Sequence, residues 1–69
     1  MENRLRELRE SFGLTQEDVA AKVAVSRQTI ISLEKGKYNP SIQLAYQLSR
    51  VFGLTIEQVF IFGDGSDRS

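Results

Sequence analysis

Apolar residues recur at helical spacing along most of the chain, in short runs separated by glycine and polar joints. Leu5, Leu8 and Phe12 lie three or four residues apart with charged residues between them. This spacing predicts an amphipathic helix over residues 3–12. Gly13 then ends the helix, because glycine adopts the left-handed backbone that closes a helix without steric cost.

The next two joints carry side chains that begin helices. Thr15 is an N-cap residue, and Asp18 three positions later completes a short capping box, which predicts a second helix over residues 15–22. Ser26 is the N-cap of a third helix that runs to about residue 35 and is closed by a glycine.

The second half of the chain continues the same pattern. Asn39, Pro40 and Ser41 predict a turn and a new cap, followed by a fourth helix in which we expect Tyr46 to pack. Its predicted apolar face comprises Ile42, Leu44, Ala45, Leu48, Val51 and Phe52. Thr55 opens a short fifth helix. The letters FGLT occur at residues 12–15 and 52–55, and we attribute them to the shared chemistry of two helix joints rather than to a duplicated unit.

Composition limits the chain to one small domain. It has 69 residues, no Cys and no His, so we expect a single all-α domain over residues 1–62, a flexible tail over residues 63–69, and no metal or cofactor. The chain contains no run of about 18 apolar residues that could form a transmembrane helix, so we expect a soluble, cytoplasmic protein. The sequence contains no phosphate-cradling glycine loop and no carboxylate pair in an evident cleft, so we expect that the protein is not an enzyme.

The charge is zero overall but unevenly distributed. Residues 22–37 contain four cations and one anion, whereas residues 40–69 contain two cations and three anions. Because Lys and Arg neutralise phosphates, the basic segment is the candidate for contact with a polyanion.

The third helix has two chemically different sides. At about 100° per residue, Ile30 and Leu33 fall on one side, and the opposite side carries polar and cationic residues. Those outer residues are Gln28, Ser32 and Lys35, with Arg27 and Ile31 on one flank. Gln matches the hydrogen-bonding edge of adenine and Arg that of guanine, so this helix is a candidate for reading DNA in the major groove.

From Arg4 to Phe60 the sequence resembles the Xre/Cro-like helix-turn-helix regulators, above all the small single-domain members. The resemblance is carried by a helix opening at Thr15 and Gln16, a short turn through Ala24, and the letters SRQTI and LEKGKYNP that follow. It implies a five-helix, lambda-repressor-like domain with the helix-turn-helix at the second and third helices. It further implies a transcriptional repressor that binds a pseudo-palindromic operator as a homodimer.

The resemblance also assigns roles to individual residues. It implies base reading by Arg27, Gln28 and Ser32, with Thr29 and Asn39 as further candidates. It implies phosphate binding by Gln16, Lys35, Lys37 and Tyr38, and a structural ion pair between Arg9 and Glu34. Alternatively, Tyr38 covers the core beneath its loop. Lys35 and Lys37 could likewise be the ordinary cationic residues that oppose the dipole at a helix C-terminus.

Two positions depart from the family pattern. Many members have Gly where this chain has Ala24, and a left-handed backbone there costs an L-residue about 1–2 kcal/mol, so we expect the turn to be shaped differently. Ile31 replaces a polar or small residue. It either contacts a thymine methyl group or packs at the rim of the core.

The end of the domain carries a last apolar run, Val59, Phe60, Ile61 and Phe62. Because the other helices already supply a core, we expect this run to form part of a homodimer interface, as a helix or as a short strand that pairs with its own N-terminus or with the partner. A second class of function remains open, that of an antitoxin or other protein-binding module on the same scaffold. No small-molecule site is evident.

Overall fold

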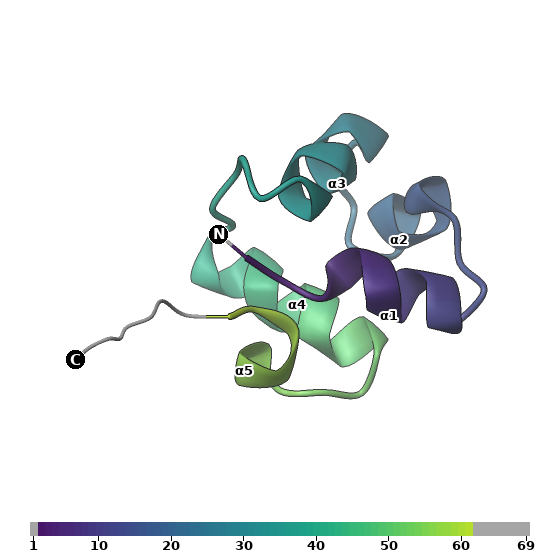
Figure 1. The fold of residues 1–69 in the computed structure, drawn as a ribbon. Coiled ribbons are helices and arrows are strands. Elements are labelled where there is room, and N and C mark those ends of the chain that lie inside the picture. Colours follow the sequence, from purple (N-terminus) through teal and green to yellow (C-terminus); the bar gives the residue numbers. More distant parts are fainter. Residues whose placement is uncertain (1, 62–69) are drawn as a thin grey trace.

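The computed structural model describes residues 2–61, which form five short helices and no sheet. The helices are α1 (Leu5–Ser11), α2 (Gln16–Lys22), α3 (Arg27–Glu34), α4 (Ile42–Val51) and α5 (Ile56–Val59). In Figure 1, α2 and α3 lie together on the upper side, α4 runs below α3, and α5 lies at the opposite side of the molecule. The predicted all-α fold is confirmed.

The predicted caps begin the helices. Thr15 Oγ1 accepts a hydrogen bond from the Asp18 N–H at 3.0 Å, and Asp18 Oδ2 accepts one from the Thr15 N–H at 2.9 Å. Thr55 and Gln58 form the same reciprocal pair at α5. At α2, the hydrogen bond from the Thr15 N–H to the Asp18 carboxylate lowers the pKa of Asp18 below its ordinary value, because it favours the charged form.

Three glycines follow helices with a left-handed backbone, Gly13, Gly36 and Gly53. Gly13 has φ of +71° and Gly53 has φ of +69°, so each of the two FGLT segments closes one helix and caps the next in the same way. An L-residue would be strained at either position.

The core is continuous and draws on all five helices. Its buried apolar members are Leu5, Val19, Ala20, Val23, Ile30, Leu33, Leu44, Ala45, Leu48, Phe52, Val59 and Phe60. None of the helices is long enough to be stable alone in water, so each depends on this shared core.

Three residues that we expected to pack inward lie on the surface. Ile42 is 80% exposed, Tyr46 is 56% exposed and Phe12 is 54% exposed. The ring of Phe12 meets that of Phe52 edge-on, with the ring centroids 5.1 Å apart. The predicted apolar face of α4 is therefore too wide. Residues 42 and 46 lie one helical turn apart on α4, on a side that borders residues 54–57 but stays largely exposed.

The end of the described chain pairs with its beginning. Asn3 and Phe60 form an isolated antiparallel bridge, with hydrogen bonds from the Arg4 N–H to the Val59 carbonyl at 2.8 Å and from the Ile61 N–H to the Glu2 carbonyl at 2.9 Å. Of the predicted alternatives for this run, the structure shows a contact with the chain's own N-terminus.

This pairing corrects the predicted dimer interface. Val59 and Phe60 are 0% and 1% exposed within a single chain, so neither side chain can supply surface to a partner. The prediction is wrong for Val59 and Phe60, because the first four helices do not complete the core and α5 and the bridge close it. Ile61 is 46% exposed, and Phe62 and the predicted tail over residues 63–69 lie outside the described residues.

Candidate nucleic-acid interface

Helix α3 is anchored by its inner side and open on its outer side. Ile30 and Leu33 are fully buried, whereas Arg27, Gln28 and Lys35 are exposed. Ser26 fixes the start of the helix by accepting a hydrogen bond from the Thr29 N–H at 3.2 Å. The predicted division of this helix into an apolar and a polar side is what the structure shows.

The candidate base-reading side chains differ in their exposure and in their hydrogen bonds within the protein. Arg27 and Gln28 project from the first turn of α3, Ser32 is half-buried one turn later, and Asn39 is exposed in the loop that follows. Thr29 is half-buried and its Oγ1 lies 3.0 Å from the Ser26 Oγ, so its hydroxyl already takes part in the helix cap.

The candidate phosphate binders lie around the same helix. Lys35, Lys37 and Tyr38 follow one another at its C-terminal end and are exposed, and the Lys37 N–H donates to the Ser32 carbonyl at 3.1 Å. Gln16 opens α2 and is half-buried, with its Nε2 donating to Glu34 Oε1 at 3.1 Å. The link from Gln16 to Glu34 was not foreseen from the sequence.

The turn between α2 and α3 keeps the left-handed backbone. Ala24 has φ of +58°, and the Val25 N–H returns to the Ala20 carbonyl at 3.0 Å. The expectation that the turn would change shape is wrong, because the packing of α2 against α3 imposes this geometry on the alanine. The strain at Ala24 is therefore stored in the joint that orients α3.

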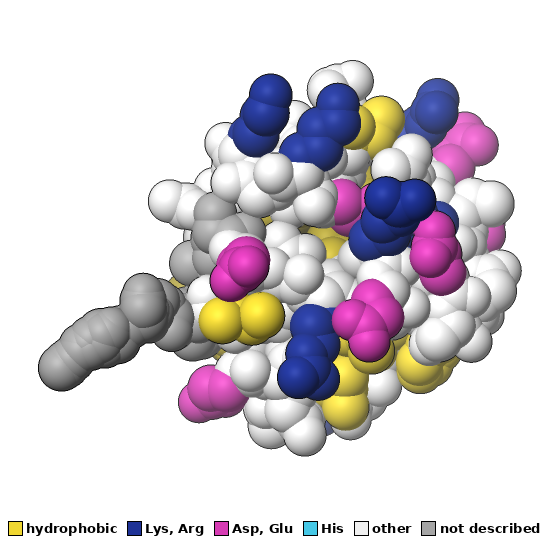
Figure 2. All heavy atoms as spheres, viewed as in Figure 1, with side chains coloured by type: hydrophobic (Ala, Val, Ile, Leu, Met, Phe, Trp, Pro, Cys, Tyr) yellow, Lys and Arg dark blue, Asp and Glu magenta, His cyan; other side chains and the backbone are white. Residues whose placement is uncertain are grey.

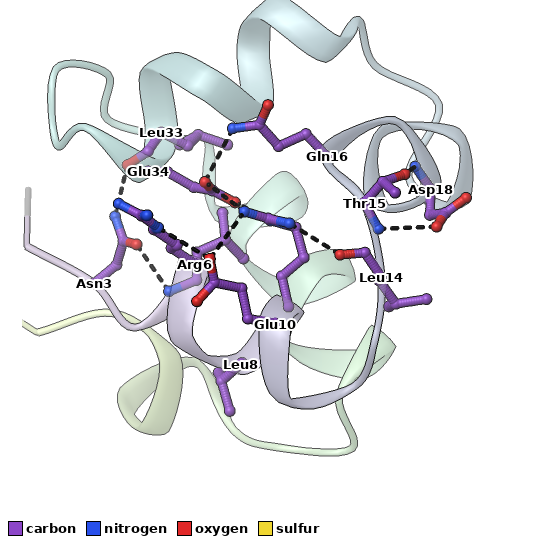
Figure 3. A network of polar contacts seen from close by, with 12 residues as sticks. Asn3, Arg6, Leu8, Glu10, Leu14, Thr15, Gln16, Asp18, Leu33 and Glu34 are labelled. Atoms are coloured by element: carbon purple, nitrogen blue, oxygen red, sulfur yellow. Dashed lines mark hydrogen bonds and ion pairs between the residues drawn. The ribbon is translucent and has the colours of Figure 1, made fainter.

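A nearly buried ion pair ties α1 to the end of α3. Arg9 Nε donates to Glu34 Oε2 at 2.6 Å, and the two side chains are only 12% and 5% exposed. Arg9 also donates through Nη1 to the Leu14 carbonyl at 2.9 Å. The hydrogen bond to Glu34 raises the pKa of Arg9, more than burial lowers it. Figure 3 shows Gln16 and Glu34 pointing toward each other in this network.

A second anchor of α3 was missed at the sequence level. Asn3 Nδ2 donates to the Leu33 carbonyl at 2.8 Å, and its Oδ1 accepts from the Leu5 N–H at 2.9 Å. An Asn shortly before a helix is a typical capping residue, and this pattern could have pointed to Asn3.

The outer side of α3 is positively charged. Between residues 27 and 41 the only acid is Glu34, and its carboxylate is paired with Arg9. Figure 2 shows several Lys and Arg side chains along the upper edge of the molecule, where α3 lies, with a hydrophobic patch between them and acidic side chains at the upper right and lower down. This face therefore suits a polyanion despite the zero net charge of the chain.

Two helices joined by a tight left-handed turn, the second with a polar and cationic outer side, define a helix-turn-helix domain. A family model described as helix-turn-helix matches residues 5–59. The chain belongs to the Xre-like helix-turn-helix family of transcriptional regulators. Because this family and its members are regulators, the prediction that the chain is not an enzyme is confirmed.

Individual relatives agree with this assignment. An uncharacterised HTH-type transcriptional regulator of Archaeoglobus fulgidus is 58% identical over 64 residues, which cover 93% of this chain and 91% of that protein. The cryptic phage CTXphi transcriptional repressor RstR of Vibrio cholerae is 30% identical over 57 residues, which cover 83% of this chain and 51% of the repressor.

A solved structure shows the same fold. The hypothetical transcription factor NHTF from Neisseria superimposes with a TM-score of 0.74 at 20% sequence identity, over 80% of this chain and 62% of the Neisseria chain. In the part of this chain that the structure describes, no helix is long and apolar enough to cross a bilayer. Residues 2–61 also contain no group of three or more potential metal ligands.

Proposed function

We propose that this protein is a sequence-specific transcriptional repressor that acts in the cytoplasm as a homodimer on a pseudo-palindromic operator. The observation that carries the proposal is the outer side of α3, which is exposed, polar and cationic while its inner side is locked into the core. A helix held in this way can enter the major groove without reorganising.

The exposed side chains suit particular base edges. Arg27 can donate two hydrogen bonds to guanine, and Gln28 can both donate to and accept from adenine. Ser32 and Asn39 extend the reading surface on either side, with Thr29 restricted to the cap. Lys35, Lys37 and Tyr38 hold the DNA backbone at the C-terminal end of α3, and Gln16, which donates to Glu34 near that end, holds it from the start of α2.

The dimer surface that we propose lies on α4 and α5 instead of on Val59 and Phe60. A surface groove of about 400 Å³, the α4–α5 groove, is lined by Ile42, Tyr46, Arg50, Leu54, Thr55, Ile56 and Glu57. It contains exposed apolar side chains and one cation and one anion. A twofold axis beside it would bring Arg50 of each copy to Glu57 of the other, so a second copy of this chain is the matching occupant.

Substitutions on α4 test this surface. Ile42→Glu and Tyr46→Glu add charge to the groove at exposed sites, and sedimentation should show monomers for both. Gln43→Glu adds the same charge on the same helix outside the groove and should leave the dimer intact. A Tyr46→Glu protein that sediments as wild type does would remove this groove from the interface.

The sign of regulation is supported by the relative RstR, which is a repressor. A protein that occupies an operator excludes other proteins from the same DNA, and such occlusion needs only tight, specific binding. Repression in this sense requires no chemistry beyond the interface described above.

A salt titration on selected and random duplexes tests specific binding. The selected duplex should bind at least about a thousandfold tighter than random DNA, and affinity should fall steeply as salt rises. Equal, weak binding to both duplexes would refute a sequence-specific regulator and favour the protein-binding module instead.

A further inference from the structure

A second groove opens between α1 and α3, next to the proposed reading surface. This α1–α3 groove has a volume of about 600 Å³, and its walls include Arg6 and Arg9 of α1, Gln16 of α2, and Arg27, Ile31 and Lys35 of α3. Arg27 and Ile31, predicted to share one flank of α3, thus both line it. The groove is continuous with the outer side of α3 through Arg27.

The charge of the groove favours an anion. Two acids, Glu17 and Glu34, also line it, but Glu34 is paired with Arg9 at 2.6 Å and accepts a further hydrogen bond from Gln16 at 3.1 Å. Arg6 is itself paired with Glu10 at 3.2 Å, and once both ion pairs are set aside, Arg27 and Lys35 still outnumber Glu17. Coulomb attraction to a phosphate therefore exceeds repulsion in this groove.

We infer that the α1–α3 groove receives a phosphodiester of the DNA backbone and that Arg6 is a phosphate contact. This inference rests on the proposed function, since it places the backbone beside the bases that Arg27 and Gln28 read. The groove is larger than a phosphate group alone and holds the adjoining sugar as well. DNA is favoured over a free phosphate compound because the groove adjoins the reading helix.

Arg6 is better placed for this contact than Arg9. The Arg9 guanidinium already donates to Glu34 and to the Leu14 carbonyl. Arg6 donates through Nε to Glu10 Oε2 at 3.2 Å, in a pair whose side chains are 72% and 57% exposed. Figure 3 shows Arg6 and Glu10 close together near the middle of the network, where Glu10 Oε2 also lies 4.0 Å from Arg9 Nη2. An exposed pair is weak, so the guanidinium can exchange Glu10 for a phosphate.

The pair itself supplies a matched control. Arg6→Gln and Glu10→Gln both break the Arg6–Glu10 ion pair, and Glu10→Gln also removes the longer 4.0 Å contact of Glu10 with Arg9. A purely structural role therefore predicts that both variants weaken DNA binding, and Glu10→Gln at least as much as Arg6→Gln. A phosphate contact predicts opposite outcomes. Arg6→Gln should weaken binding to selected and random duplexes by the same factor, whereas Glu10→Gln frees the cation and should bind both as tightly as wild type or tighter.

The decisive readout is the salt dependence of the dissociation constant. Loss of one phosphate contact lowers the slope of log affinity against log salt concentration by about one. The ratio of the dissociation constants of Arg6→Gln and wild type should therefore fall about threefold to fourfold from about 50 to about 200 mM salt. A wild-type slope for Arg6→Gln, or equal weakening by both variants, would overturn the inference.

Two further measurements separate the possible failures. If wild type discriminates selected from random DNA but Arg6→Gln keeps its slope, the inference fails and the proposed function stands; if wild type does not discriminate, the proposed function itself fails. Titration of the DNA-free protein with inorganic phosphate should show no saturable binding at millimolar concentrations. Saturable binding that Arg6→Gln abolishes would assign the groove to a free phosphate compound instead.

Discussion

Replacing Ala24 by glycine should stabilise the protein, although the substitution removes a methyl group. Ala24 has φ of +58°, a conformation that costs an L-residue about 1–2 kcal/mol and costs glycine nothing sterically. Glycine loses about 0.5–1 kcal/mol more than alanine through chain entropy on folding. Ala24 is exposed, so no packing is lost. The net gain is about 0.5–1 kcal/mol.

Thermal unfolding followed by circular dichroism measures this gain. For a domain of this size, 1 kcal/mol shifts the melting temperature by about 4–8 °C, so Ala24→Gly should melt roughly 2–8 °C above wild type. DNA affinity should be unchanged, because the turn geometry is retained.

The chain offers a matched control three residues earlier. Ala21 is exposed in the last turn of α2, where a helical backbone favours alanine, and Ala21→Gly should cost about 1 kcal/mol. The same chemical change should thus have opposite signs at residues 21 and 24. If Ala24→Gly lowered the melting temperature as Ala21→Gly does, the strain assigned to the turn would not exist.

Three further outcomes are expected. Arg9→Ala should cost about 3–5 kcal/mol in urea unfolding, because it leaves Glu34 buried and unpaired, whereas Arg6→Ala should cost under about 0.5 kcal/mol; equal costs would contradict the burial argument. Asp18 has a lowered pKa in the folded state, so its contribution is present above the ordinary value of about 3.9 and is lost as the pH falls through the lower folded value. Asp18→Asn should therefore reduce the loss of stability on acidification, and an unchanged pH profile would oppose this. Lys37→Ala should weaken all duplexes alike and lower the salt slope by about one, and a loss confined to the selected duplex would make Lys37 a base reader.

Local chemistry made most of the fold predictable. Caps and glycine closures act within four or five residues, so Thr15, Ser26, Ser41, Thr55 and Gly13 could be placed from the sequence alone. The division of α3 into buried and open sides followed from its period in the same way.

Features set by distant contacts were less predictable. Ile42 and Tyr46 fit an apolar stripe on α4, but which edge of the stripe is covered depends on where α5 lies. Val59 and Phe60 were assigned to an interface because no sequence pattern in so short a run predicts that the chain returns to pair with Asn3. The left-handed backbone at Ala24 contradicts local preference and is imposed by helix packing.

The spatial neighbours within the candidate site were likewise hidden. Gln16 and Glu34 are 18 positions apart in the sequence, and only the folded chain brings the amide to the carboxylate. Arg6 looked like an ordinary surface cation until the structure placed it on the wall of the α1–α3 groove.

Selection of binding sites from a random duplex pool, performed with wild type and with Gln28→Ala, tests most directly whether the outer side of α3 reads bases. Wild type should select two inverted half-sites about one helical turn apart. Gln28→Ala should lose preference at one base pair in each half-site and bind the selected duplex about 1–3 kcal/mol more weakly. Recovery of the same consensus with the same affinity by both proteins would contradict the placement of α3 in the major groove.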